Sequence, residues 1–134
     1  MPYPSDRPAA ETRPTPTPRV LLVEDDRFAG PALARLLWAA GYRVAWVESV
    51  AAAVAAVAVA RDADPFAAVV SDLLLPDGLG WEAFPTSRAV GVTVVLAMTA
   101  GDPALLAEAR RRGASAVIRK PFDFADLAAL LPPP

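Results

Sequence analysis

Short, almost wholly apolar runs alternate along this chain with longer segments of helical periodicity. Five runs have the length and composition of strands: residues 20–23, 43–47, 66–71, 92–97 and 115–119. Continuous apolar strands joined by helices are typical of a parallel sheet that is covered on both faces. The sequence therefore predicts an α/β fold of the (βα)5 type, a doubly wound five-stranded parallel sheet with right-handed crossovers.

Helix signals fill the intervals between these runs. Asp26 can cap a helix that ends at Gly41, and its predicted buried stripe consists of Phe28, Ala32, Leu36 and Ala40, with Leu33 and Leu37 beside it. Ser49 can cap a second helix, with Val50, Val54 and Val57 on one face.

Three shorter helices follow. One is expected over residues 80–84, before Pro85 interrupts the pattern, and the last over residues 123–131. Between them, Asp102 and Pro103 form a cap and first turn for a helix that Gly113 ends.

The length of 134 residues fits one domain. Residues 1–18 hold six prolines and are expected to form an extended, disordered tail. Residues 19–131 are the predicted domain, and the prolines at 132–134 are either an end or the start of a linker.

Composition excludes several functions. The chain has no cysteine and no histidine, which removes disulfides, thiol chemistry and Ser-His-Asp catalysis. The net charge of −2 argues against nucleic-acid binding by this domain. No apolar stretch is long enough to span a membrane and no secretory signal is recognisable, so a cytoplasmic protein is expected.

Residues suited to a metal or phosphate site follow the first, third, fourth and fifth apolar runs. Because the carboxyl ends of parallel strands meet at one edge of a sheet, we expect these side chains to converge there. They are Glu24, Asp25 and Asp26 after the first run, Asp72 after the third, Thr99 after the fourth and Lys120 after the fifth.

Converging carboxylates repel one another unless a cation offsets their charge. Mg²⁺ prefers such oxygen ligands, and Mn²⁺ is the alternative. A hydroxyl at Thr99 and an ammonium at Lys120, the only lysine of the chain, suit contacts with phosphoryl oxygens. Asp72 would be the nucleophile of an aspartyl-phosphate reaction.

These segments resemble the receiver domains of two-component response regulators, the CheY-like family. The matching motifs are "VLLVEDD", "AAGYRV", "VVSDLLLPDGLG", "LAMTA" and "GASAVIRKPF", in that order across residues 19–131. The resemblance implies a flavodoxin-like fold with strand order 2-1-3-4-5. It also implies a cis peptide bond between Lys120 and Pro121.

The same resemblance assigns roles to individual residues. Asp72 matches the phosphoacceptor, Thr99 the switch hydroxyl and Lys120 the phosphate-contacting lysine. Glu24 and Asp25 match the acidic pair that holds Mg²⁺ together with Asp72, and the backbone carbonyl of Leu74 matches a further ligand. Asp26 falls outside this set, which leaves it the role of helix cap.

The predicted function is a phosphoacceptor signalling domain, which turns over no external metabolite. Its phosphoryl donor would be a sensor histidine kinase or histidine phosphotransfer protein, its downstream effector is open, and a monomer or weak homodimer is expected. One alternative is a receiver-like binding module that does not use phosphate. Another is an aspartyl-phosphate phosphatase, although Leu74 stands where that enzyme class needs a second aspartate.

Three features depart from the family pattern, one of which is Pro85, which interrupts what would be the third helix. Val117 occupies the position that usually carries an aromatic switch residue, so the usual aromatic read-out is not expected. The last helix is brief before the terminal prolines, which predicts a reduced surface beside it.

Overall fold

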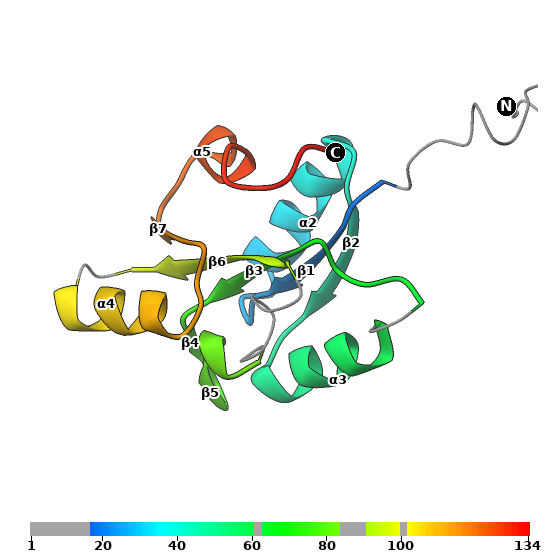
Figure 1. Cartoon of the computed structure of the whole chain (residues 1–134). Helices are drawn as coiled ribbons and strands as arrows, with labels where there is room; N and C mark the ends of the chain where they lie inside the picture. The colour runs from blue at the N-terminus through cyan, green and yellow to red at the C-terminus, as the bar shows by residue number, and fades with distance from the viewer. Residues whose placement is uncertain (1–16, 61–62, 84–90, 100–101) are drawn as a thin grey trace, which may run out of the picture.

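A five-stranded parallel sheet forms the centre of the molecule (Figure 1). The computed structural model describes residues 17–60, 63–83, 91–99 and 102–134. The strands stand in the order β2-β1-β3-β6-β7, which confirms the predicted order 2-1-3-4-5. Their bounds are Arg19–Val23 for β1, Arg43–Val47 for β2, Ala68–Asp72 for β3, Thr93–Met98 for β6 and Ala116–Arg119 for β7.

Helices cover both faces of this sheet (Figure 1). One face carries α2 (Ala29–Ala39) and α5 (Phe124–Ala128), and the other carries α3 (Val50–Ala60), the 3-10 helix η1 (Gly80–Ala83) and α4 (Pro103–Arg111). Each face has its own apolar core. Leu37 of α2 and Leu127 of α5 belong to the core on the first face. Ala53 of α3, Trp81 of η1 and Ala109 of α4 belong to the core on the opposite face.

Local capping explains where the helices begin. The Asp26 carboxylate accepts hydrogen bonds from the amides of Phe28 and Ala29, and Asp102 accepts one from Ala104. Both contacts confirm the predicted caps. Gly41 (φ 108°) and Gly113 (φ 104°) follow the last turns of α2 and α4 in the left-handed region, which glycine adopts without the clash of a Cβ atom.

The predicted stripe of α2 was right for Leu33, Leu37 and Ala40, which pack in the core, and wrong for Phe28, Ala32 and Leu36, which are exposed. Phe28 is 90% exposed and Leu36 49% exposed, whereas Gly30 and Leu37 are buried against the sheet. Gly30 allows the close approach of Trp46 on β2, whose ring would lie 2.4 Å from a Cβ atom at that position.

The prediction for α3 was also right only in part, since Val50 and Val57 pack against the core but the third valine of that face does not. Val54 is exposed, and Ala53 and Ala60 supply the fully buried positions. Because nearly every side chain of this helix is alanine or valine, apolar periodicity does not distinguish its two faces.

A small hairpin follows β3, where the sequence predicted only a turn. It consists of β4 (Leu74–Leu75) and β5 (Gly78–Leu79), which pair in antiparallel fashion. At its tip the Asp77 carboxylate accepts hydrogen bonds from the amides of Val50 and Ala51, at 2.8 and 2.9 Å. The hairpin is thus fastened to the first turn of α3.

The residues after α5 pack back onto the domain. Leu131 is buried in the core beneath α2 and α5, and the Tyr42 hydroxyl donates a hydrogen bond of 2.5 Å to the carbonyl of Pro132. Of the predicted N-terminal tail, residues 1–16 lie outside the described part of the chain, as does Pro85. Within the described residues, none of the helices has the length and apolar character needed to cross a bilayer.

Candidate functional site

The carboxyl ends of β1, β3, β6 and β7 lie side by side at one edge of the sheet. Strand order reverses between β1 and β3, the position at which open parallel sheets bind ligands. The strand ends place Glu24 and Asp25, Asp72, Thr99 and Lys120 along this rim. Their convergence agrees with the expectation from the sequence.

Lys120 bridges two of the acids. Its ammonium nitrogen Nζ lies 3.0 Å from Oε1 of Glu24 and 2.5 Å from Oδ1 of Asp72. Glu24 and Asp72 are both buried. The backbone of Lys120 is also held in place, because its amide donates a hydrogen bond of 2.8 Å to the carbonyl of Met98. The only lysine of the chain is therefore held between carboxylates from two neighbouring strands.

Three carboxylates lie close enough to share one cation. One oxygen from each of Glu24, Asp25 and Asp72 lies within 4.8 Å of the others, and Asp25 is on the exposed side of the group. Carboxylate oxygens open to solvent on one side fit Mg²⁺, which retains several water ligands. The donor set thus fits a hard divalent cation.

Burial and mutual contacts shift the pKa values of Asp72, Glu24 and Lys120. Burial, together with hydrogen bonding to Glu24, raises the pKa of Asp72 to about 7, although Lys120 opposes this shift. Burial also acts to raise the pKa of Glu24, but hydrogen bonds with Asp72, Lys120 and the Asp26 amide outweigh it and lower that pKa. Burial disfavours the charged form of Lys120, yet contacts with the two acids raise its pKa above the ordinary value.

The raised pKa of Asp72 favours a proton on this carboxyl group, beside an ionised Glu24 and a charged Lys120. A divalent cation would displace that proton, because the metal needs ionised oxygens.

Thr99 and Leu74 line the same pocket as Asp72 and Lys120. The pocket has a volume of about 150 Å³, and its remaining walls are apolar. Thr99 is exposed at the end of β6, and Leu74 begins the β4–β5 hairpin. Participation of the Leu74 carbonyl in metal binding stays a prediction.

The backbone around Asp72 leaves no space for a side chain at Gly80. A Cβ atom there would lie 2.2 Å from the carbonyl oxygen of Asp72 and 2.8 Å from Oγ of Ser71. The Gly80 amide donates to the carbonyl of Leu73 at 2.7 Å. Glycine at this position therefore lets η1 begin directly beside the acid.

Two contacts near the site were missed by the sequence analysis. Asp77 was interpreted as turn chemistry, but its carboxylate caps α3, 26 and 27 residues away in the sequence. The indole N–H of Trp46 donates a hydrogen bond to the carbonyl of Glu24, 22 residues away. Neither contact has a local sequence signal, since each joins separate elements.

Comparison with known proteins agrees with this architecture. The family model described as "Response regulator receiver domain" matches residues 20–132. The swarming motility regulation protein RssB of Serratia marcescens is 34% identical over 110 residues, which cover 81% of this chain and 48% of that protein. The transcriptional activator protein IrlR of Burkholderia pseudomallei is 30% identical over 112 residues, covering 83% of this chain and 47% of IrlR.

Solved structures give the same result. The non-phosphorylated HemR receiver domain from Leptospira biflexa superposes with a TM-score of 0.71 at 28% identity, over 85% of this chain and 90% of that one. A CheY-like receiver domain protein from Methanospirillum hungatei has a TM-score of 0.74 at 23% identity, over 84% and 88% of the two chains, and supports the fold alone.

The chain spans about half the length of the curated relatives it matches. The shared part is the one that carries the strands and the acidic rim described above. The chain therefore belongs to the response regulator receiver domain family, the signalling domains of two-component systems.

Proposed function

We propose that Asp72 accepts a phosphoryl group from the phosphohistidine of a sensor histidine kinase or a histidine phosphotransfer protein. The observation that carries this proposal is the placement of Lys120 between Asp72 and Glu24, at 2.5 and 3.0 Å, with Asp25 beside them. A carboxylate oxygen of Asp72 forms the new P–O bond. The P–N bond to the donor imidazole breaks, and its electron pair remains on the imidazole nitrogen.

Each neighbouring residue has a role in this transfer. Lys120 holds an ammonium beside the Asp72 oxygen, which favours the ionised nucleophile and then neutralises an oxygen of the bound phosphoryl group. The Thr99 hydroxyl, in the same pocket, donates a hydrogen bond to a second oxygen. Movement of Lys120 and Thr99 toward the phosphoryl group biases an equilibrium between two surface conformations, which a downstream effector distinguishes.

Glu24, Asp25, Asp72 and the carbonyl of Leu74 would hold Mg²⁺, or Mn²⁺ in its place. When bound, the cation neutralises charge that develops on the transferring phosphoryl oxygens. Glu24 also keeps Lys120 in position through its own contact of 3.0 Å.

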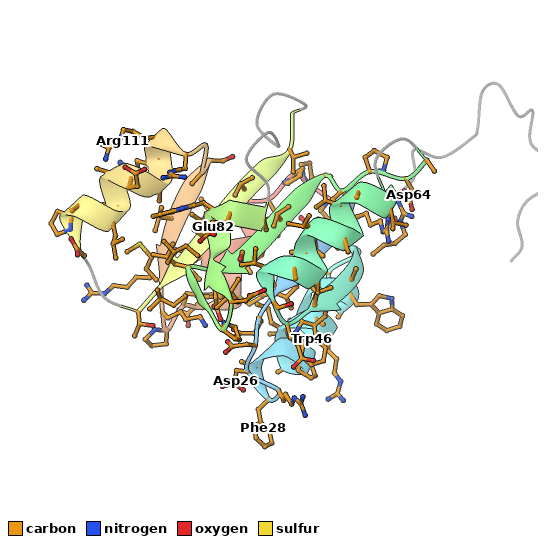
Figure 2. The ribbon with its side chains drawn as sticks, turned by 90° about the horizontal axis from the view of Figure 1, so that it is seen from below. Asp26, Phe28, Trp46, Asp64, Glu82 and Arg111 are labelled. Atoms are coloured by element: carbon orange, nitrogen blue, oxygen red, sulfur yellow. The ribbon has the colours of Figure 1, made fainter. Side chains whose placement is uncertain are left out.

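The donor protein must reach Asp72 from the open side of the rim. Asp25 is exposed there, and Phe28 projects outward at the start of α2 (Figure 2). An exposed aromatic residue four positions after Glu24 suits transient contact with a partner helix. We further propose a cytoplasmic location and a monomer or weak homodimer.

Incubation with acetyl phosphate and Mg²⁺ tests the function. We expect incorporation of one phosphoryl group by the wild type and none by Asp72→Asn, measured by intact-protein mass spectrometry. Beryllofluoride should shift amide resonances around Thr99 and Lys120 in the wild type alone. Equal behaviour of the two proteins would favour a binding module that does not use phosphate. Sustained release of inorganic phosphate from added phosphate esters would instead indicate a phosphatase.

A further inference from the structure

Trp46 reaches from β2 to the acidic rim. Its ring lies against Gly30, where a Cβ atom would be 2.4 Å from the indole, and the residue is half-buried (Figure 2). Its indole nitrogen Nε1 donates a hydrogen bond of 2.8 Å to the backbone carbonyl of Glu24. The contact therefore joins the edge strand to a residue of the proposed metal site.

Strand β2 holds both backbone groups of Glu24. The Glu24 amide donates a hydrogen bond of 3.0 Å to the carbonyl of Val47, and the Glu24 carbonyl accepts the indole N–H. Pairing between β1 and β2 ends at Val23 and Val47. The two bonds of Glu24 therefore continue the attachment to β2 for one residue past the end of β1. The first bond holds the peptide between Val23 and Glu24, whereas the indole bond orients the plane of the next peptide, which links Glu24 to Asp25.

The orientation of this peptide matters because the two acids are held differently. The Glu24 carboxylate contacts Lys120 and the Asp26 amide, which fix its direction. The Asp25 carboxylate is exposed, so its direction depends on the backbone from which it leaves. A rotated peptide would move one carboxylate of the group away from the other two.

We infer that Trp46 is a positioning residue of the cation site, which orients the Glu24–Asp25 peptide through its indole N–H. This inference rests on the proposed function, because it assumes that the acids bind a divalent cation. Outer contacts of this kind typically change metal affinity about 10- to 100-fold when they are removed. Trp46→Phe retains an aromatic ring against Gly30 but removes the donor.

Titration with Mg²⁺ by isothermal calorimetry tests the inference. We expect Trp46→Phe to weaken Mg²⁺ binding roughly tenfold at a temperature where the variant remains folded. Trp38→Phe is the matched control, since Trp38 is 73% exposed and should leave the affinity unchanged. In the metal-free protein, the amide ¹⁵N resonance of Asp25 should shift in Trp46→Phe and not in Trp38→Phe.

A merely structural role for Trp46 gives a different result. Trp46→Phe would then lower the melting temperature while its Mg²⁺ affinity and Asp25 resonance stayed within error of the wild type, which would overturn the inference. If Trp46→Phe fails to fold, benzothienylalanine at position 46 decides the question by the same two readouts, because it keeps the shape of the ring system without the N–H.

Asp25→Asn separates this inference from the proposed site. Loss of Mg²⁺ binding in Asp25→Asn with unchanged binding in Trp46→Phe refutes the positioning role and leaves the site standing. Unchanged binding in Asp25→Asn refutes the cation site itself.

Discussion

Single side chains at the rim work against the stability of the metal-free domain. Asp72 is buried beside a second carboxylate, and its pKa of about 7 lies well above the 3.8 of an ordinary aspartate. The folded protein therefore binds a proton more tightly than the unfolded chain does. Between pH 4 and pH 7, this difference makes the free energy of unfolding fall as pH rises.

The variant Asp72→Asn removes this pH dependence. In the absence of divalent cations, we expect it to be more stable than the wild type at pH 8 by about 1–3 kcal/mol, with the difference shrinking toward pH 4. Urea unfolding at several pH values measures it. A stability difference that is constant from pH 4 to pH 8 would contradict the raised pKa.

Lys120 provides a second test at the residue scale. Its Nζ contacts two carboxylates at 2.5 and 3.0 Å, a geometry for a compact charge that the broader guanidinium of arginine does not reproduce. We expect Lys120→Arg to slow phosphorylation by acetyl phosphate at least tenfold, an order-of-magnitude figure for the loss of a charge contact. Arg119→Lys, on the exposed neighbouring residue, should keep the wild-type rate. A normal rate in Lys120→Arg would mean that charge alone suffices.

At the scale of elements, the hairpin after β3 is tied to α3. Asp77 satisfies the first two amides of that helix, and this contact lowers the pKa of its carboxyl below the ordinary value. An ionised carboxylate at a helix N-terminus also interacts favourably with the helix dipole. The hairpin that contains Leu74 and the first turn of α3 therefore stabilise each other.

Removal of this cap should loosen both elements. We expect Asp77→Ala to lower the free energy of unfolding by about 1–2 kcal/mol and to speed amide exchange in the first turn of α3. Asp102→Ala, which removes the cap of α4, is the matched control and should speed exchange in α4 instead. Unchanged exchange at Val50 and Ala51 in Asp77→Ala would show that the contact contributes nothing in solution.

Prediction from sequence succeeded for the strands and was only partly right for the helix faces, for identifiable reasons. Apolar runs located the five strands along the chain, and the resemblance to receiver domains supplied their order in the sheet. The residues after the first, third, fourth and fifth runs converged at one rim because parallel strands end together. Phe28, Leu36 and Val54 were placed on the wrong side because α2 and α3 carry apolar residues around most of their circumference. The contacts of Asp77 and Trp46 depend on how elements pack, which no local pattern encodes.

Considered as a whole molecule, the domain extends to the residues after α5. Leu131 is 7% exposed and packs in the core beneath α2 and α5, whereas Leu130 is 37% exposed. The Tyr42 hydroxyl donates a hydrogen bond to the carbonyl of Pro132, the residue after Leu131. The terminal prolines thus follow a segment that belongs to the folded unit.

The two leucines form a matched pair for a test of this boundary. We expect Leu131→Ala to destabilise the domain by about 2–4 kcal/mol because it leaves a cavity in the core. Leu130→Ala should cost about 0.5 kcal/mol or less, as is usual for surface positions. Thermal unfolding followed by circular dichroism measures both. Equal effects of the two substitutions would argue that the segment does not pack as described.

The placement of the only lysine of this chain has a practical consequence for handling the protein. Reagents that acylate amines attack the neutral form, which the ion pairs of Lys120 suppress in the native state. Under native conditions such reagents will modify the terminal amine first, and prolonged coupling to an activated biosensor chip will block the rim itself. Biotin or dye should therefore be attached through the terminal amine at low pH, or through a cysteine introduced on the far side of the sheet.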